Sequence, residues 1–544
     1  MKRWSLLVLV LLAAAALFVK SKERDRSNNP VQAGQFLRLN LEREPATLDP
    51  RKGGDVVSTS LHFMLFNGLA RVGADGKTQL SGADSYTLST DKLTYTFYLK
   101  EATWSNGLPV TAHDYEYSWK KIADPIFPAP NAHLIYPIKN ARACKEGKLP
   151  ISELGVKALS DRTLVVTLER PCPYLLDLLS FCIFFPISKE NELIYSDWAY
   201  NKGDRFVCNG PFLLKEWKHQ NEILLVKNPH YLESTLIKLS GIHMSMVASE
   251  NTALQMYEKG ELDLLTTSAS HLPIDSIERL KQRGYLHIHP SAASTFCTFN
   301  TSKKPFSNIN IRKAFGYAIN RQELVDNITQ LGEPIATGPI PPLLKNGRNR
   351  LFFRDGDKAA AKAYLAKGLE ELAIKKEELN SLTYTYSISE SNDKIAQAIQ
   401  QQWKETLGVT VNLCSTEHKT LLDKLGKRNY DFAQAIWVAQ YPDQVNILER
   451  FALKDNVKNY AGWEDLSYMR LLNRSNNEFD SEERALTLEE AEERFVEMMP
   501  VTLLFHMNYA FLIQPYVRDV SFTPMGFVLI EHLSINKEEK ARQK

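Results

Sequence analysis

The segment best suited to bind a ligand in this sequence is the apolar run DFAQAIWVAQYPD, residues 431–443. It reads as a strand that leads into Trp437 and then into turn residues around Pro442 and Asp443. A flat aromatic side chain at the end of a buried strand can form the floor of a binding site. We therefore take Trp437–Asp443 as the first candidate site. The alternative is that Trp437 is a core aromatic residue closing a sheet edge.

Catalytic motifs are missing from the sequence. It contains no H-E-x-x-H, no G-x-S-x-G, no G-x-x-x-x-G-K-[ST] and no G-x-G-x-x-G pattern. His287 and His289 would share one face of a strand and could ligate a metal, but no further ligand cluster accompanies them, so surface or packing roles are expected. We therefore predict no catalytic residue, cofactor or metal.

The segments before residue 431 predict how the candidate site is held. Residues 382–388 alternate like a strand, and the helix expected after them carries apolar side chains at i, i+4 spacing: Ile395, Ile399, Trp403 and Leu407. Gly408 would end this helix. A strand at 409–413, a helix at 419–427 and a strand at 430–437 complete a β-α-β-α-β order. This order predicts a parallel sheet with Trp437 at a carboxyl end, where open α/β sheets bind ligands.

Length and charge restrict the class of protein. A chain of 544 residues should divide into about two to four domains. The 66 Lys and Arg residues nearly balance the 64 Asp and Glu residues, so no net field attracts nucleic acid or an anionic membrane.

The N-terminus predicts export. Lys2 and Arg3 precede an uncharged run from Trp4 to Val19, which is typical of a signal peptide and shorter than the roughly 20 residues that span a bilayer. An uncleaved anchor stays open as an alternative. No cysteine follows this run, so a lipoprotein anchor is not expected and the periplasm is the predicted location. The six cysteines show no metal spacing, and most are expected to be buried free thiols, with no pairing predicted.

Several short motifs stand in a fixed order along the chain: EPATLDP (44–50), WSNGLPVTAHDYEYSW (104–119), CNGPF (208–212), NPHY (228–231), GELD (260–263) and AINR (318–321). Each is weak alone. Together they resemble the extracytoplasmic oligopeptide-binding proteins of ABC importers, the family 5 solute-binding proteins. The resemblance covers residues 36–534.

The resemblance implies an α/β, periplasmic-binding-protein-like fold in which two lobes with mixed sheets are joined by a hinge, plus an extra small domain. Residues 1–29 would be signal peptide and linker. Lobe I would be discontinuous, comprising residues 30–75, 190–290 and 500–544. The small domain would span 76–189 and lobe II 291–499.

The resemblance also implies how a ligand would bind. Proteins of this family close two lobes over an extended peptide and hold its backbone by strand-like hydrogen bonds, which is β-augmentation. The matching segments here are 53–58 and 435–441, and Trp437 would stack beside the ligand. The implied ligand-binding residues are Gly53, Gly54, Asp55, Asn392, His418, Leu425, Gln434, Trp437, Val438, Ala439, Gln440, Tyr441 and Asp443.

The sequence departs from the family at the ends of the ligand. Gln440 stands where an Asp in characterised peptide binders pairs with the free amino group, and Asp443 could substitute only with a shifted anchor. Leu425 and Gln434 stand where close relatives have arginines, and Asn392 stands where they have a His. Because a neutral pocket disfavours a zwitterion, we expect a ligand without free charged termini, such as a capped or modified peptide or a cell-wall peptide fragment.

The expected function is a monomeric periplasmic receptor that delivers peptide or peptide-like ligand to an inner-membrane ABC permease by lobe closure. One alternative keeps the fold and binds a nickel chelate, haem, glutathione or an oligosaccharide. Two others are an exported hydrolase and a membrane-anchored sensor or adhesin. The sequence leaves the ligand's identity and length, the disulfide pairing and the permease open.

Overall fold

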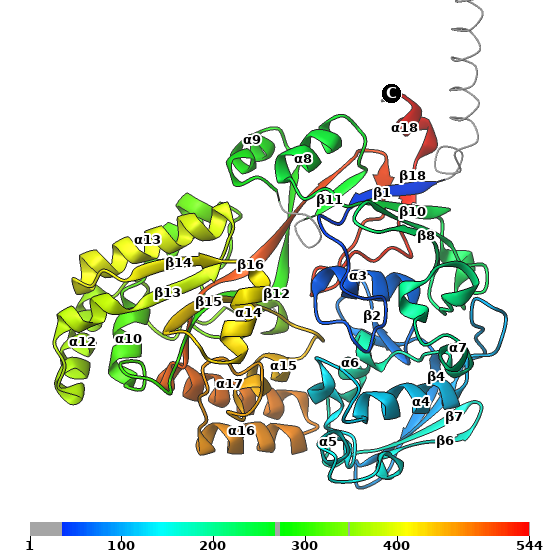
Figure 1. Cartoon of the computed structure of the whole chain (residues 1–544), viewed down its shortest axis with the longest axis horizontal. Helices are drawn as coiled ribbons and strands as arrows, with labels where there is room; N and C mark the ends of the chain where they lie inside the picture. The colour runs from blue at the N-terminus through cyan, green and yellow to red at the C-terminus, as the bar shows by residue number, and fades with distance from the viewer. Residues whose placement is uncertain (1–34, 267–271, 346–348, 543–544) are drawn as a thin grey trace, which may run out of the picture.

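The computed structural model describes residues 35–266, 272–345 and 349–542 (Figure 1). The predicted signal peptide and linker at 1–29 lie outside these residues. Within the described part of the chain, no helix is both long and apolar enough to cross a membrane. The chain combines helices with several separate sheets, and two large halves meet along a boundary crossed by long strands (Figure 1).

Two long antiparallel strands run through both halves of the molecule. These are β12 (Leu286–Phe299) and β16 (Val501–Ile513), and they lie in a six-stranded sheet with the order β11-β16-β12-β15-β13-β14. The register between β12 and β16 shifts between Pro290 and Ser294. A proline cannot donate a ladder hydrogen bond, so an irregularity there is expected. The short strand β11 (Leu264–Thr266) pairs with the far end of β16.

The predicted β-α-β-α-β unit is confirmed. It comprises β13 (Thr383–Ser387), α13 (Glu390–Leu407), β14 (Asn412–Thr416), α14 (His418–Gly426) and β15 (Phe432–Val438), with β13 parallel to both β14 and β15. The four apolar side chains expected on one face of α13 are buried, and Gly408 ends the helix with φ of 69°. The second strand, β14, begins at Asn412 and not at residue 409 as expected. Val409 and Val411 are buried in the connection before it.

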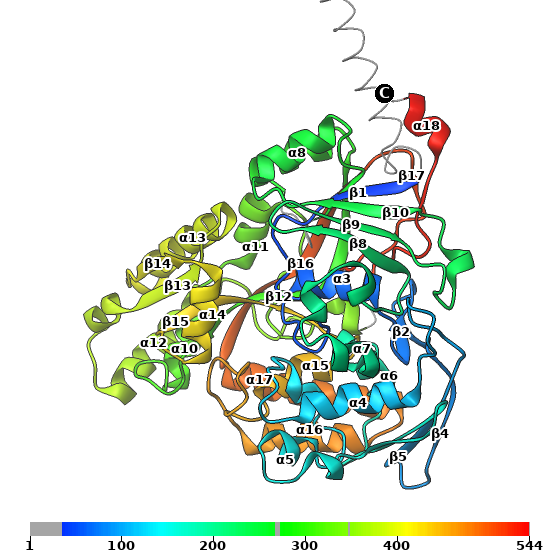
Figure 2. The same cartoon turned by 45° about the vertical axis from the view of Figure 1, so that its right-hand side comes forward.

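The other half contains a four-stranded sheet with the order β1-β10-β9-β8. Its strands are β1 (Phe36–Asn40), β8 (Phe212–Lys218), β9 (Glu222–Lys227) and β10 (Gly241–Ser245). Helix α3 (Val56–Leu65) lies beside it in both views (Figures 1 and 2). Asp55 caps the start of this helix, because its side chain accepts a hydrogen bond from the Ser58 N–H.

A second four-stranded sheet, β4-β5-β7-β6, belongs to the segment predicted as the small domain. It comprises β4 (Ala83–Leu88), β5 (Thr94–Leu99), β6 (Val156–Ser160) and β7 (Thr163–Thr167), and α4 (Ala112–Ala123) covers it. Thr111 is the N-cap of α4, and its N–H donates to the Asp114 side chain at 2.9 Å. The domain boundaries near residues 75, 190, 290 and 500 stay predictions.

The remaining helices and short strands cover these sheets. Helices α16 and α17 pack on each other and lie beside α5 and α6, which belong to the segment predicted as the small domain (Figure 1). The bounds of these other elements are β2 (Ala70–Val72), β3 (Thr78–Leu80), α5 (Ala141–Lys145), α6 (Leu175–Leu179), α7 (Lys189–Ile194), α8 (Glu250–Glu258), α9 (Ile277–Gln282), α10 (Ile309–Tyr317), α11 (Arg321–Leu324), α12 (Lys358–Leu372), α15 (Val445–Leu448), α16 (Leu466–Asn477), α17 (Ser481–Met498), β17 (Val517–Arg518), β18 (Ser534–Ile535) and α18 (Lys537–Arg542).

The cysteines are unpaired, and His287, considered above as a metal ligand, packs against an aromatic ring. All six cysteines are free thiols; five are buried and Cys414 is partly buried, as expected for most of them. His287 stacks on Phe511 with ring centroids 5.4 Å apart. Residues 35–266, 272–345 and 349–542 contain no group of three potential metal ligands.

Candidate functional site

The candidate site begins at an open edge of β15. This strand pairs along its whole length with β12, but its pairing with β13 ends at Ala433. The Ala439 N–H donates to the Ala292 carbonyl on the β12 side at 2.8 Å. Because backbone groups of successive strand residues point to alternate edges, Ile436 and Val438 direct theirs to the edge that β13 leaves open. An extended chain could add there as a further strand.

Trp437 lies beside this edge and is only 4% exposed. One face of its indole is covered by the Arg450 guanidinium, whose Cζ lies 2.9 Å from the ring centroid. The centroid of its ring also lies 6.2 Å from that of Phe296 and 6.0 Å from that of Phe451. Trp437 is therefore a buried support for the edge in this arrangement. The predicted stacking of Trp437 on a ligand stays a prediction.

Gln440 is held by Asn446 and Arg450. Its N–H donates to Asn446 Oδ1 at 2.9 Å, and Arg450 Nη2 donates to its side-chain Oε1 at 3.3 Å. Arg450 Nη2 also donates to the Val438 carbonyl at 3.4 Å, so its guanidinium lies at the open edge of β15. Position 440, where the family resemblance implies an acidic side chain, is thus neutral here and adjoins a cation.

Asp443, considered above as an anchor for a ligand's amino group, is paired with Arg484. Arg484 donates to both of its carboxylate oxygens, at 2.7 and 2.8 Å, and the Val445 N–H donates to it at 2.8 Å. The Arg484 side chain is 13% exposed and the Asp443 side chain is 10% exposed. A carboxylate bound bidentately to a guanidinium has little remaining capacity for a ligand's ammonium group.

Tyr441 joins the two halves. Its ring stacks on Tyr174, which precedes α6, and its hydroxyl donates to Glu449 Oε1 at 2.9 Å. Burial raises the pKa of Glu449 to about 7. An ion pair between Arg142 of α5 and Asp455, at 2.9 Å, crosses the same boundary.

Gln434 and Asn392 are brought together in a neutral network. Gln434 Nε2 donates to Asn392 Oδ1 at 2.6 Å, and Asn392 Nδ2 donates to the Ser387 carbonyl at 2.9 Å. The Tyr384 hydroxyl donates to Gln434 Oε1 at 3.3 Å. Leu425 is 1% exposed, so it belongs to the core beneath α14.

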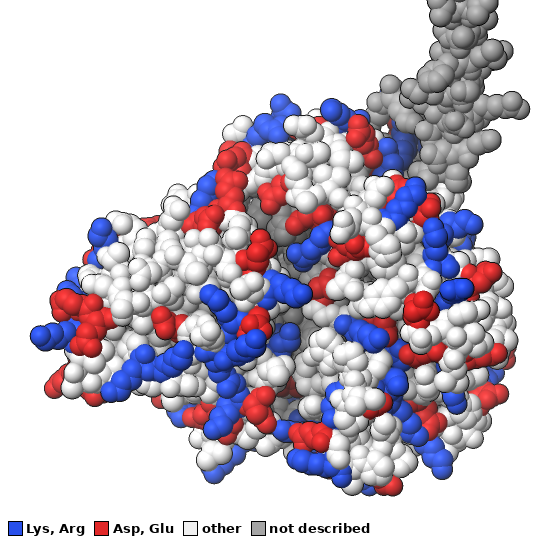
Figure 3. All heavy atoms as spheres, in the orientation of Figure 1, with Lys and Arg blue, Asp and Glu red and all other residues white. Residues whose placement is uncertain are grey.

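His418 opens α14 and faces the other half of the molecule. Nearby protein displaces water and lowers the pKa of its imidazole, and the positive charge of Arg43 lowers this pKa further. Arg43 belongs to the loop after β1, so the start of α14 looks across the boundary at that loop. Figure 3 shows Lys and Arg side chains along this boundary and a hollow between the two halves.

Gly53, Gly54 and Asp55 form the start of α3 in the opposite half. The Gly53 carbonyl accepts a hydrogen bond from Asn131 at 2.9 Å, and a Cβ atom at Gly53 would lie 2.5 Å from His62. Only glycine fits at this position without movement of His62. Asp55 accepts from the N–H and the hydroxyl of Ser58, at 2.9 and 2.6 Å, so its carboxylate is used by its own helix.

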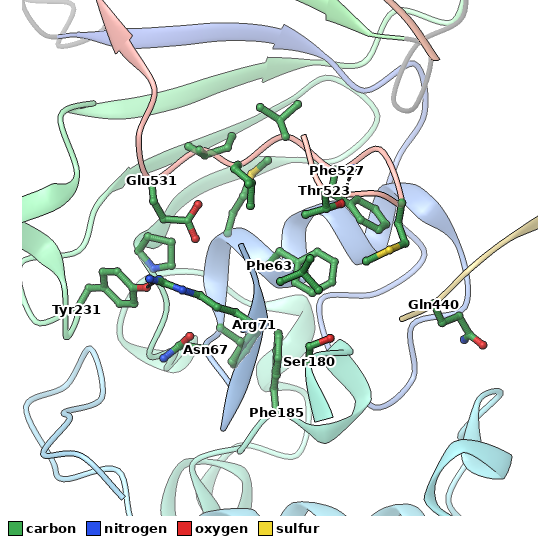
Figure 4. Close-up of a pocket in the computed structure, with 18 residues that line it drawn as sticks. Phe63, Asn67, Arg71, Ser180, Phe185, Tyr231, Gln440, Thr523, Phe527 and Glu531 are labelled. Carbon is green, nitrogen blue, oxygen red and sulfur yellow. Dashed lines mark hydrogen bonds between the residues drawn. The ribbon is translucent and has the colours of Figure 1, made fainter. Parts of the chain in front are cut away.

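An apolar pocket with about 690 Å³ of empty space, partly open to solvent, lies next to Gln440 (Figure 4). Its walls come from α3, β2, Phe185 and the segment 523–531. Within it Arg71 pairs with Glu233 at 2.7 Å, whereas most other lining side chains are apolar. The Gln440 side chain points away from the pocket in Figure 4. No other predicted site residue lines it.

The fold thus gathers Gln434 with Asn392, and Trp437, Val438 and Gln440 around Arg450. It places Gly53, Gly54 and Asp55 in the other half. Sequence reasoning missed Arg450, which lies beside Glu449 in the mixed polar and apolar segment NILERF, residues 446–451. It also missed Asn446, which no pattern distinguished. The roles of all these residues in ligand binding stay predictions.

Comparison with known proteins agrees with this architecture. Residues 78–459 match the model of bacterial extracellular solute-binding proteins, family 5. The oligopeptide-binding protein OppA of Bacillus subtilis is 37% identical over 93% of this chain and 94% of its own length. The structure of Haemophilus influenzae OppA in complex with RPPGFSPFR superimposes with a TM-score of 0.82 and 27% identity, covering 93% of this chain and 99% of that one.

The comparisons also bear on the arrangement of the two halves. The unliganded open form of the murein tripeptide-binding protein MppA superimposes with a TM-score of 0.73, which is lower than the 0.82 of the OppA–peptide complex. This match has 26% identity and covers 92% of this chain and 97% of that one. The similarity to these solved structures confirms the predicted α/β solute-binding fold. From its family match and its similarity along almost the whole chain, this protein belongs to the family 5 bacterial extracellular solute-binding proteins.

Proposed function

We propose that this protein is the periplasmic substrate-binding component of an ABC importer, and that it captures a peptide or peptide-like ligand by closing its two lobes. The observation that carries the proposal is the open edge of β15 at Ile436 and Val438. A ligand added there would be held by its backbone, so many side-chain sequences would be tolerated, with water filling unused space around the side chains.

Contacts across the boundary support capture by lobe closure. The Tyr174–Tyr441 stack and the Arg142–Asp455 ion pair join parts of the chain that separate if the lobes swing apart. Strands β12 and β16 cross between the halves, and the shift after Pro290 offers a place for bending. Such closure converts ligand binding into a change of shape that a permease can recognise.

The proposal includes export and delivery. The apolar N-terminal run would direct the chain to the periplasm, without a lipoprotein cysteine, and an inner-membrane permease would receive the ligand there. Whether the signal is removed can be read from the mass of the mature protein. An uncleaved N-terminus would favour the anchored alternative.

The neutral side chains at the ligand's ends narrow the ligand class. Gln440 offers no charge to an ammonium group, and the Gln434–Asn392 network and buried Leu425 offer none to a carboxylate. The ligand that fits these positions has no free ammonium at the Gln440 end, as in a capped or modified peptide or a cell-wall peptide fragment.

A hydrolase is less well supported. Ser294 Oγ and His506 Nδ1 lie 2.8 Å apart, which resembles a nucleophile and base. Both residues are at most 3% exposed, however, and burial lowers the pKa of His506 to about 3, so this pair has neither access to substrate nor the proton affinity of a general base.

Native mass spectrometry of protein purified from the periplasm, followed by denaturation, tests the proposal. We expect release of peptide-like species bound one per chain. Synthetic versions N-methylated at alternate residues should then bind at least about tenfold more weakly, because each lost backbone hydrogen bond weakens the added strand. Release of a metal chelate, haem or oligosaccharide, or insensitivity to N-methylation at every position, would refute it.

A further inference from the structure

Arg450 is a buried cation whose partners are all neutral. It is 7% exposed, and it donates from Nε to the Asn446 carbonyl at 3.1 Å. Its Nη2 reaches the Val438 carbonyl and two side-chain amide oxygens, at 3.3 to 3.4 Å. Among the described residues, no carboxylate lies within ion-pair distance of its guanidinium and no acceptor bonds Nη1. Buried arginines usually have an anionic partner, so this one lacks an expected anion.

A second cation lies near Arg450. Lys458 follows in the loop after Phe451, and burial together with the positive charge of Arg450 lowers the pKa of its ammonium group. His133, in the segment Ala132–Ile135, lies close enough to both residues for their charges to act on its imidazole. Burial and then the charges of Arg450 and Lys458 lower the pKa of His133 to about 3. In the described part of the chain, neither Lys458 nor His133 pairs with a carboxylate. Glu449, whose charge acts on Arg450, accepts a hydrogen bond from Tyr441.

Two further donors beside Arg450 lack acceptors. Trp437 Nε1, on the ring beneath the guanidinium, and Asn446 Nδ2 are both buried without a hydrogen-bond partner. The orientation of the Asn446 amide is fixed, because its oxygen accepts from the Gln440 N–H and from Arg450. The surroundings of Arg450 therefore contain an excess of donors and positive charge, which is the complement of an anion.

The position of Arg450 connects this excess to the ligand. Its bond to the Val438 carbonyl places the guanidinium at the open edge of β15, just beyond the backbone groups of Ile436 and Val438. A strand added along that edge would have one end at Arg450. A free ammonium group there would meet like charge, whereas a carboxylate would meet its complement.

We propose that Arg450, assisted by Lys458, binds a carboxylate at the end of the extended ligand next to Gln440. The inference rests on the proposed function, because it uses the added strand to bring this end to Arg450. The carboxylate can be the C-terminal carboxylate of a peptide or an acidic acyl group on its amino end. The chemistry at Arg450 is the same in both cases.

Three synthetic probes test the proposal by calorimetry: N-acetyl tetra-alanine with a free carboxyl end, the same peptide as an amide, and N-succinyl tetra-alanine amide. At least one carboxylate probe should bind wild type about tenfold or more tighter than the neutral amide. Which probe does so identifies the source of the carboxylate. Equal affinities for all three would overturn the inference and leave the proposed function intact.

Variants assign the preference to its residues. Arg450→Gln should abolish the preference, Lys458→Gln should reduce it, and Arg450→Lys should retain part of it. Lys454→Gln removes the same charge from the same loop as Lys458 and should change nothing, and Arg474→Gln is the matched control for Arg450→Gln. Thermal melting checks that each variant is folded. A preference that survives in folded Arg450→Gln would refute the assignment.

The ligand released from purified protein decides the case in which no probe binds. A released ligand without a carboxylate would overturn the inference. A carboxylate-bearing species that is not peptide-like, and whose rebinding requires Arg450, would support the inference and overturn the proposed function.

Discussion

The rings of Tyr174 and Tyr441 lie almost parallel, with centroids 5.8 Å apart and an interplanar angle of 2°. Tyr174 belongs to the segment of the small sheet and Tyr441 directly follows the candidate binding strand, so the stack joins the two halves at the edge of the proposed site. Arg484 lies over Tyr174 with its Cζ 5.3 Å from the ring centroid and binds Asp443. This stacked pair would therefore couple the candidate site to the proposed closure of the lobes.

Replacing Tyr174 should favour the open form. Aromatic pairs contribute about 0.5–1.5 kcal/mol beyond their buried area, so Tyr174→Ala should shift the closed-to-open ratio several-fold. Small-angle scattering of the ligand-free protein should report a larger radius of gyration, and ligand should reverse the increase. Tyr200→Ala removes an exposed ring elsewhere and is the control. An unchanged radius in Tyr174→Ala would argue against this contact as a closing element.

Introducing an acidic side chain at position 440 should change which ligand end is accepted. Gln440→Asp should improve affinity for peptides with a free amino end, by roughly 1 kcal/mol or about fivefold, because a charge-assisted bond replaces a neutral one. Arg450 will compete for the new carboxylate, so the double variant Gln440→Asp/Arg450→Gln should gain more than the single one. Calorimetry with free and N-acetylated forms of one peptide measures this. Unchanged affinity for the free form in both variants would contradict the role given to Gln440.

The Asp443–Arg484 ion pair should matter for stability more than for ligand choice. Asp443→Asn leaves a largely buried guanidinium without its partner, which costs about 3–5 kcal/mol for a fully buried pair and somewhat less at this exposure. The thermal midpoint should fall clearly, whereas the ratio of affinities for free and capped peptides should not change. Asp443→Asn/Arg484→Met removes both charges and should recover most of the lost midpoint. A changed affinity ratio in Asp443→Asn would instead place Asp443 at the ligand.

Glu449 gives a pH dependence of known sign. Burial raises its pKa from 4.5 to about 7, so the folded protein holds this proton more tightly than the unfolded chain does. Its contribution to stability is therefore most favourable below pH 4.5, declines as the pH rises to about 7, and is constant above that. The total change is on the order of 3 kcal/mol.

The variant Glu449→Gln should gain stability relative to wild type as the pH is raised from 5 to 8, because the glutamine cannot lose a proton. Comparing the two proteins' thermal midpoints isolates Glu449 from the buried histidines, whose lowered pKa values contribute with the opposite sign in both. Glu482→Gln, at an exposed carboxylate, should run parallel to wild type. Parallel curves for Glu449→Gln would show that Glu449 titrates normally.

Local patterns predicted much of the framework because they depend on neighbours in the chain. The spacing of Ile395, Ile399 and Trp403 identified one buried face of α13, and Gly408 identified the helix end, since a left-handed residue there favours glycine. The order of elements gave the parallel β13–β15 unit. The start of β14 was placed too early, because buried Val409 and Val411 alternate like strand residues without pairing.

The candidate site was predicted less completely, because its chemistry depends on pairings between distant residues. Asp443 could be read as a ligand anchor from its position, but only its contact with Arg484 shows that the carboxylate is already bound. Gln434 and Asn392 were singled out separately, and the structure joins them in one hydrogen-bonded network.

The sequence alone determined the family, the α/β elements and the strand that carries the candidate site, because ordered motifs and apolar periodicity are local properties of the chain. The tertiary structure decided which edge of β15 is open and which charges lie there. Arg450 follows Trp437 by 13 positions, and its guanidinium reaches the indole only because α15 and the turn before it bring the chain back over the end of the strand. Long-range packing sets the burial and the partner of a charge, so it also sets what that charge can bind.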